Sequence, residues 1–395
     1  MPISPTEVQM WEADTGDQTV KLSDREINEK YARGEGRIVL ENNREKLPGF
    51  VNLMSQPNYM DLRPFYQRRP RWTPAQQSLL IESFIMNIPV PPVFLYEKDY
   101  NSYEVMDGQQ RITAIRAFYQ NELKLTGLES WPELNGRRYS SLPDTIRAGI
   151  DRRSITSIVL LKESTDNEEE ASNLRETVFD RLNTGGIKLE RQEIRNALYS
   201  GLFNDMLERV TRTDEFRNIW GLPLYTDGEV DRNTILRNNP LFAKMGDAEI
   251  VLRFFALRHV NHYRRGMQGF LDIYMRKAAS FPEADVIYLE ILYGQTLDLA
   301  MNIYGELIFR PFDAEQRHWE EKPHRAFYDA VMIGLADFID DADVLIDRSD
   351  DIIAATAQLF HDHPQGTFTG RGNTKQDVID RISLYSDMIA QFVEP

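Results

Sequence analysis

The stretch SYEVMDGQQRITAIRAFY, residues 102–119, constrains the fold more than any other part of the chain. Its short apolar beginning is typical of a strand, and the aspartate and glycine that follow it are typical of a turn. From Gln109 onward, apolar residues recur near helical spacing, at Ile112, Ile115, Phe118 and Tyr119. The stretch therefore predicts a strand that delivers Asp107, a sharp turn at Gly108 and a helix that begins at Gln109.

The neighbouring segments extend this pattern into a compact α/β domain. VPPVFLYE and SYEVMDG are short apolar segments separated by KDYN, so a β-hairpin is expected. Thr73 is a good N-cap, Pro74 follows it, and Gln76 completes a capping box for a helix that ends before Pro89. Further segments predict a short helix at 46–56, a strand at 153–161, a helix at 166–186 and a long amphipathic helix at 189–210.

Beyond about residue 215 every periodic segment is helical, and no strand is predicted. A chain of 395 residues usually forms more than one core. We therefore expect an α+β protein with a loosely structured leader (1–45), an α/β domain (46–210) and an all-helical domain (211–395).

Charge is distributed unevenly along the chain. The net charge is −16, yet residues 63–153 hold 13 basic and 10 acidic side chains, a net charge of about +3. Within RPFYQRRPRW, four arginines alternate with aromatic residues, which suits phosphates and base faces: Arg63, Arg68, Arg69 and Arg71 beside Phe65, Tyr66 and Trp72. The alternative is an arginine cluster that pairs with the protein's own acidic surface.

Composition limits the cellular context. The sequence has no cysteine, which excludes disulfides and thiolate metal sites and suits a reducing compartment. No secretory signal is recognised at the N-terminus, and no apolar run is long enough to cross a bilayer. We expect a soluble cytoplasmic protein without membrane contact.

The residues at MDGQQR suit an anion site. The first-turn N–H groups of a helix and its dipole favour anions, and Arg111 in that turn can hold a phosphate. Gln109 and Gln110 can hydrogen-bond sugar or base edges, and Asp107 can carry a metal or orient water. Alternatively, Asp107 is an N-cap and Gly108 an ordinary turn residue, which leaves the glutamines and Arg111 without a role.

Three blocks in this order resemble the N-terminal domain of GmrSD-type restriction enzymes, in the wider ParB/sulfiredoxin-like superfamily. They are FYQRRPRWTPAQQSLLIESFIMNIPVPPVFLYE, MDGQQRITAI and FDRLNTGGIKLERQEIRNAL, and they cover about residues 65–198. The resemblance implies a ParB-like nucleotide-binding domain in a bacterial defence against phage. Similar proteins bind and hydrolyse nucleoside triphosphates at the Asp-Gly-Gln-Gln-Arg motif and sense modified DNA.

The resemblance also implies residue roles. Asp107, Gln110 and Arg111 would be catalytic, and Gly108, Gln109 and Arg181 would bind the nucleotide. The block near the same cleft that is tied to DNA sensing gives Tyr66, Gln67 and Arg68 as expected DNA contacts, and the arginine–aromatic pattern adds Arg63, Arg69 and Arg71.

The third block resembles the segment of ParB-type domains that approaches the triphosphate, and this resemblance makes Asn183 the expected ligand of the accompanying Mg²⁺ ion. Such an ion takes few protein oxygens. Alternatively, Asn183 to Gly186 only cap a helix C-terminus. Arg195 and Asn196, with Glu193, match the family too, but a buried ion pair that fixes helix to sheet explains them equally well.

The chain departs from the family in one respect, because no C-terminal HNH nuclease is recognised. RHVNHY holds His259 and His262 inside a helical pattern without a strand pair, and HDHP holds His361 and His363 without a nearby third ligand. We expect all four to be surface or loop histidines, and His318 and His324 to lie at helix boundaries. DNA cutting would then need a partner nuclease or an unrecognised site.

The sequence thus predicts a nucleoside-triphosphate-dependent sensor or switch that acts on or near modified phage DNA, with a homo-oligomer left open. Two alternatives remain: a nucleotide-gated DNA-binding or assembly module without significant turnover, and a regulatory protein whose motif is a structural relic. An Arg111 guanidinium held in an internal ion pair, with no open hollow beside it, would contradict a phosphate site at residues 107–111.

Overall fold

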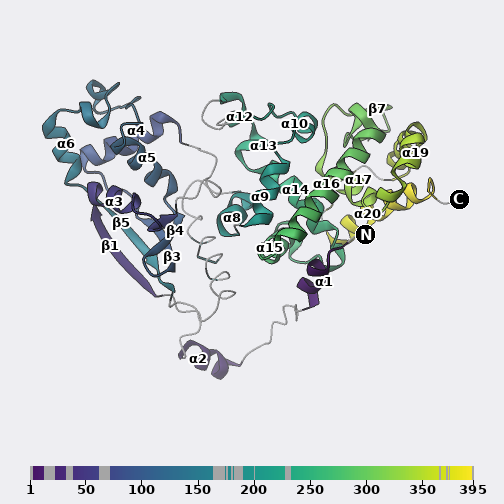
Figure 1. The fold of residues 1–395 in the computed structure, drawn as a ribbon, viewed down its shortest axis with the longest axis horizontal. Helices are drawn as coiled ribbons and strands as arrows, with labels where there is room; N and C mark the ends of the chain where they lie inside the picture. Colours follow the sequence, from purple (N-terminus) through teal and green to yellow (C-terminus); the bar gives the residue numbers. More distant parts are fainter. Residues whose placement is uncertain are drawn as a thin grey trace. The chain divides into compact units, whose positions relative to one another are not determined.

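The structure, a computed structural model, describes residues 3–12, 23–32, 39–61, 72–162, 174, 177–178, 181, 190–199, 201–226, 233–363, 366–370, 372 and 374–393. Two compact units divide the chain: residues 19–198 form one, and residues 1–18 together with 199–395 form the other. The first unit is called here the sheet unit and the second the helical unit. Figure 1 shows both, coloured along the sequence.

A five-stranded sheet forms the centre of the sheet unit, in the order β1-β5-β3-β4-β2. The strands are β1 (Leu40–Lys46), β2 (Met60–Asp61), β3 (Val93–Asp99), β4 (Ser102–Asp107) and β5 (Ser154–Leu160). The antiparallel pair β3 and β4 confirms the predicted hairpin, and β5 runs parallel to β3 on its other side. The parallel β3–β5 pair is possible because helices in the intervening chain make the crossover.

Helices pack on this sheet over a large core, and a second, smaller cluster joins Tyr96, Met106 and Leu160. The helices of the unit are α2 (Asp24–Ala32), α3 (Leu47–Met54), α4 (Pro74–Met86), α5 (Gln109–Tyr119), α6 (Asp144–Asp151) and α8 (Arg191–Leu198). The core joins Val93, Val159 and Ile155 of the sheet to residues of α3, α4 and α5 such as Phe118, which is fully buried. α4 begins as predicted, with Thr73 and Gln76 forming a capping box.

Two buried polar residues of α4 hold the segment that follows α5. The carboxylate of Glu82 accepts backbone N–H bonds from Glu129 at 3.3 Å and from Ser130 and Trp131 at 2.8 Å. One turn earlier, Ser78 Oγ accepts from the Thr126 N–H at 3.0 Å. A buried carboxylate is tolerated where several donors satisfy it, so Glu82 acts as the anchor of this loop.

In its described part, the helical unit consists of helices and one very short strand pair. Its helices are α1 (Pro5–Glu12), α9 (Leu202–Val210), α10 (Asp214–Trp220), α12 (Thr234–Asn238), α13 (Pro240–Ala243), α14 (Gly246–Leu257), α15 (Gly266–Ala278), α16 (Glu283–Tyr304), α17 (Arg325–Leu335), α18 (Ala342–Asp347), α19 (Ser349–Asp362) and α20 (Lys375–Ala390). α14 lies in the interior, since all of its residues are buried, and α17 is buried from Ala326 to its end. α17 packs against α14, α16 and α20.

The approach of α17 to α20 depends on a glycine. A Cβ atom added at Gly334 would lie 2.5 Å from Cδ1 of Tyr385, closer than real Cβ contacts come. Between α14 and α17, the guanidinium of Arg253 makes a buried ion pair with the carboxylate of Asp329, with Nε and Oδ1 2.9 Å apart. Arginine and aspartate side chains are seldom fully buried unless they are paired in this way.

The structure differs from the predicted domain limits. The leader expected at 1–45 contains α1, which belongs to the helical unit, and β1, which is an edge strand of the sheet. The helix expected at 189–210 is divided into α8 and α9, with Gly201 between them at φ +146°. α9 buries Phe203, Met206 and Leu207 in the helical unit, so the division falls at 198/199 rather than 210/211.

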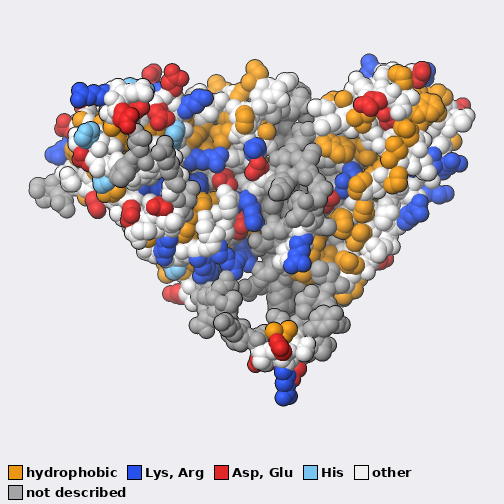
Figure 2. All heavy atoms as spheres, turned by 180° about the vertical axis from the view of Figure 1, so that it is seen from behind, with side chains coloured by type: hydrophobic (Ala, Val, Ile, Leu, Met, Phe, Trp, Pro, Cys, Tyr) orange, Lys and Arg blue, Asp and Glu red, His pale blue; other side chains and the backbone are white. Residues whose placement is uncertain are grey.

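The helical unit also contains a short strand pair. β6 (Phe312–Asp313) and β7 (His318–Trp319) form a small antiparallel pair where only helices were predicted. Within the described ranges, no helix is both long enough and apolar enough to span a membrane. Figure 2 shows Lys and Arg side chains interspersed with Asp and Glu on the described surface of both units.

Candidate functional site

The predicted strand–turn–helix at residues 102–119 is confirmed. β4 ends at Asp107, Gly108 adopts a left-handed conformation with φ +95°, and α5 begins at Gln109. A Cβ atom at Gly108 would lie 2.6 Å from Cγ1 of Val93 and 3.0 Å from Nη2 of Arg111. Both the backbone conformation and the lack of space therefore require glycine at this turn.

Asp107 does not cap α5. The N-cap position is Gly108, which has no side chain with which to cap the helix. The alternative interpretation of Asp107 as an N-cap is therefore wrong. The first turn of α5 instead carries backbone N–H groups at a helix N-terminus, where the dipole favours negative charge.

The carboxylate of Asp107 pairs with Arg111 one helical turn later. Arg111 Nη2 donates to Asp107 Oδ2 at 2.7 Å and to the carbonyl oxygen of Pro92 at 3.1 Å. The Arg111 side chain is 16% exposed and that of Asp107 26% exposed. One condition that would contradict a phosphate site is thus present, namely an internal ion pair.

The ion pair uses only part of the guanidinium. Arg111 Nε is buried without a hydrogen-bond partner, and Nη1 makes no hydrogen bond with any residue that the structure describes. A buried donor without an acceptor is uncommon in proteins. The amides of Gln109 and Gln110 are half-buried and, in the same described part, also make no hydrogen bond. Three polar side chains in one helical turn thus retain hydrogen-bonding capacity for a ligand.

The remaining predicted site residues lie mostly outside the described part of the chain. This holds for Asn183 and for the whole expected DNA contact, Arg63, Tyr66, Gln67, Arg68, Arg69 and Arg71. Arg181 is described as a helical, exposed residue that has contacts of its own. The structure therefore brings together Asp107 to Arg111 and leaves the other positions as predictions.

Helix α8 carries a buried cluster of polar side chains, of which the sequence indicated Arg195 and Asn196 but not Gln192. Gln192 and Asn196 are each 1% exposed and Arg195 is fully buried. Arg195 Nη1 donates to Gln192 Oε1 at 3.0 Å, and Gln192 Nε2 donates to Asn196 Oδ1 at 3.0 Å, while Asn196 Nδ2 is buried without a partner. The i, i+3 and i+4 spacing of these residues was the available sequence signal.

The described residues do not form a binding site for a resident metal ion. Among them, no group of three or more His, Asp or Glu side chains is arranged to hold a metal. Asp107 is the one predicted site carboxylate that is described, and it is engaged by Arg111.

Three of the histidines have defined positions in the structure. His361 pairs with Asp362, and His324 is the N-cap residue of α17, as expected for a helix boundary. His259 was expected at the surface or in a loop, but it is only 5% exposed and its Nε2 lies 3.0 Å from Oε1 of Glu7. Its position in a loop is confirmed, since His259 lies in the turn after α14, but its burial was not expected, because its partner lies far away in the sequence.

Comparison with known proteins bears on the sheet unit. Residues 50–200 match the family model described as the N-terminal domain of the GmrSD restriction endonuclease. No curated protein and no solved structure matches the chain. The match confirms the family resemblance for this part of the chain, which includes β4, the Gly108 turn and α5, whereas the wider superfamily assignment stays a prediction.

Proposed function

We propose that this chain, which carries a GmrSD-type N-terminal domain at residues 50–200, is a nucleoside-triphosphate-binding and -hydrolysing switch protein of a bacterial restriction system directed against phage. The triphosphate binds at the turn formed by Asp107 to Arg111. The observation that supports this assignment most directly is the unused hydrogen-bonding capacity of Gln109, Gln110 and Arg111 in the first turn of α5. Backbone N–H groups at such a turn bind phosphate without further charges.

In this proposal, Asp107 and Arg111 act as a unit. The ion pair and the bond to Pro92 O fix the orientation of the guanidinium. Nη1 and Nε can then donate to a phosphate while Nη2 keeps its protein acceptors. Gln110 orients the attacking water, and Gln109 and Arg181 hold the rest of the nucleotide. Hydrolysis of a phosphoanhydride needs mainly such positioning and charge neutralisation, with Mg²⁺ arriving as part of the nucleotide substrate.

The experiment is a phosphate-release assay on the purified chain with each of the four nucleoside triphosphates, with and without DNA. We expect turnover that is lost in Asp107→Ala and in Arg111→Ala. Arg147→Ala is the matched control, because Arg147 forms an exposed ion pair with Asp144 in α6 of the same unit. Unchanged turnover in both site variants would exclude this site as the catalytic one.

A second candidate function is a nucleotide-gated binding module with little turnover. The Asp107–Arg111 pair favours it, since a carboxylate held by an arginine is less available to activate water. Nucleotide binding that is lost in Arg111→Ala, without phosphate release in the wild type, would support this second function. Absence of both binding and release would leave the motif with a purely structural role.

DNA, including modified phage DNA, is the proposed second ligand, through the arginine–aromatic stretch at residues 63–72. Because the chain carries a net charge of −16, we expect weak binding with few phosphate contacts, and therefore strong dependence on salt. The double variant Arg68→Ala/Arg69→Ala should lower the salt slope by about 2, whereas Arg25→Ala, at an exposed arginine of α2, should not change it. Affinity that is flat between low and moderate salt would exclude this DNA contact. A partner nuclease would carry out any DNA cleavage.

A further inference from the structure

The N-terminal helix α1 is attached to the helical unit through a fully buried carboxylate. Glu7 Oε1 lies 3.0 Å from Arg258 Nη1, 3.0 Å from His259 Nε2 and 2.9 Å from the hydroxyl of Tyr274, and Oε2 lies 3.2 Å from Arg258 Nη2. The Ser4 N–H also donates to Oε2, at 3.1 Å, closing a capping box. Both oxygens are thus saturated by donors, four of which come from residues about 250 positions away.

A second anchor lies one helical turn further along α1. The indole of Trp11 stacks on the ring of His262, with centroids 4.5 Å apart and an angle of 5° between the planes. Phe270 stacks on it at 6.0 Å, and the ammonium of Lys277 lies 5.4 Å from its centroid. Lys277 Nζ also donates to the carbonyl oxygen of Met10 at 2.7 Å. Trp11 is 7% exposed, so α1 is held by one polar and one aromatic contact.

These contacts are complementary in charge and in chemistry. The side chains of Arg258 and Glu7 are both 0% exposed, and a buried charge of this kind is strongly unfavourable without its partner. The helical unit therefore presents the Arg258 guanidinium next to an aromatic and basic surface. This arrangement suits a helix with a carboxylate in its first turn and an aromatic residue four positions later. Within this chain, residues 4–11 supply that pattern. Figure 1 shows α1 beside α15, which carries Tyr274, Phe270 and Lys277.

The position of α1 in the chain gives this site a consequence. Residues 1–18 belong to the helical unit, residues 19–198 form the sheet unit, and residue 199 returns the chain to the helical unit. The sheet unit is therefore an insertion, and its N-terminal connection is held by non-covalent contacts of α1. Its C-terminal connection is the continuous chain from α8 to α9.

We infer that the surface of the helical unit formed by Arg258, His259, Tyr274, His262, Phe270 and Lys277 is a receptor site for a helix, with residues 4–11 of the same chain as its occupant. Binding of α1 at this site attaches the chain on the N-terminal side of the inserted sheet unit to the helical unit. Release of α1 leaves the sheet unit attached only through the chain at residues 198–199. The inference does not depend on nucleotide binding by the sheet unit.

The test compares the full-length wild type with Glu7→Ala by native-state hydrogen exchange. We expect the amides of α1 to exchange at least about 10-fold faster in Glu7→Ala, with those of α17 unchanged, because a buried Arg258 without its partner no longer retains the helix. Val8→Ala is the matched control, since Val8 lies on the same helix and is 49% exposed. Unchanged protection of α1 in Glu7→Ala would overturn the inference.

A labelled peptide of residues 1–14 gives a second readout. It should bind full-length Glu7→Ala, whose site is vacated, at least about 10-fold more tightly than the wild type, whose site is occupied. The same peptide with Glu7→Ala should bind neither. Equal binding of the intact peptide to both chains would overturn the inference, and so would a wild-type dimer that dissociates in Glu7→Ala, because α1 would then come from a second copy. If Glu7→Ala fails to fold, Trp11→Ala, which keeps the ion pair, takes its place in both measurements.

Discussion

Arg111 Nη2 donates to Asp107 Oδ2 at 2.7 Å, across the single turn that joins β4 to α5. The same nitrogen donates to Pro92 O, the residue before β3, so one guanidinium links the end of one strand, the start of its neighbour and the first turn of a helix. Gly108 lies inside this arrangement, where an added Cβ would be 3.0 Å from Nη2. The turn is therefore held in one geometry before any ligand binds, which is the condition for preorganised recognition.

Substitution of Gly108 should reveal this constraint. We expect Gly108→Ala to destabilise the protein by about 2 to 4 kcal/mol, because alanine disfavours φ +95° and its Cβ would collide with Val93. Urea unfolding measures the effect. Gly221→Ala is the control, since Gly221 has φ +64° with no atom within 4 Å of an added Cβ, and it should cost only about 1 kcal/mol. Equal costs for the two variants would show that the space around Gly108 is not restrictive.

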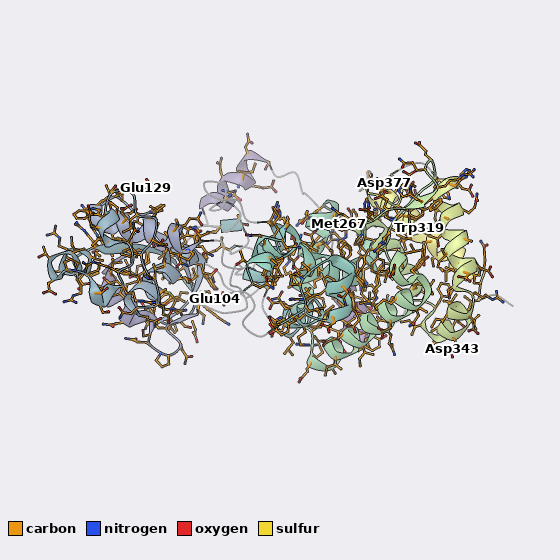
Figure 3. All side chains as sticks on the ribbon, turned by 90° about the horizontal axis from the view of Figure 1, so that it is seen from above. Glu104, Glu129, Met267, Trp319, Asp343 and Asp377 are labelled. Atoms are coloured by element: carbon orange, nitrogen blue, oxygen red, sulfur yellow. The ribbon has the colours of Figure 1, made fainter. Side chains whose placement is uncertain are left out.

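Loss of the Glu82 carboxylate should release the loop after α5. Glu82→Ala leaves three backbone N–H groups without their acceptor, and we expect a loss of about 2 to 4 kcal/mol in urea unfolding. Glu129→Gln, at the exposed side chain labelled in Figure 3, should change stability by less than about 0.5 kcal/mol. A Glu82→Ala effect as small as that of the control would mean that water replaces the carboxylate without cost.

The Glu7 contact should make stability depend on pH in a defined direction. Burial alone would raise the pKa of Glu7, but the hydrogen bond with His259 and the charge of Arg258 outweigh it and lower the pKa from 4.5 to about 2. A folded-state pKa below the unfolded one stabilises the protein above pH 4.5, and this stabilisation is lost as the pH falls through about 2. The shift corresponds to about 3 kcal/mol at neutral pH.

Glu7→Gln removes this dependence. We expect the difference in unfolding free energy between wild type and Glu7→Gln to be about 3 kcal/mol at pH 7 and to shrink steadily between about pH 4.5 and 2. Denaturant titrations of both chains at several pH values measure it, and other acidic groups cancel in the comparison. A difference that stays constant over this range would contradict an ionised Glu7 in the folded state.

The buried pair between α14 and α17 should behave as two coupled charges. Asp329→Asn leaves the buried Arg253 without the carboxylate that it pairs with, and we expect a loss of about 3 to 5 kcal/mol. Arg253→Met combined with Asp329→Leu should recover most of that loss, because two apolar side chains fill the same space. Asp343→Asn, at the exposed position labelled in Figure 3, is the control with almost no effect. If the double variant is no more stable than Asp329→Asn, the pair contributes through its charges and not through its packing alone.

Local features were predictable from the sequence. The capping box of Thr73 and Gln76, the β3–β4 hairpin and the turn at Gly108 each depend on residues only a few positions apart, and all were confirmed. The family resemblance expected at about residues 65–198 was confirmed too, by the family match at residues 50–200.

Contacts between distant residues were decided only in the folded chain. Nothing near Glu7 in the sequence indicates that Arg258, 251 positions later, completes it, so residues 1–45 read as a leader while α1 is part of the helical unit. The helical pattern of 189–210 likewise continues through Gly201. The helix is nevertheless divided there, because α9 buries its apolar face in a different core from that of the sheet unit. Helix propensity and capping act over a few residues. The burial of apolar surface and the pairing of buried charges depend instead on which segments meet in space, and a local sequence pattern does not specify these meetings.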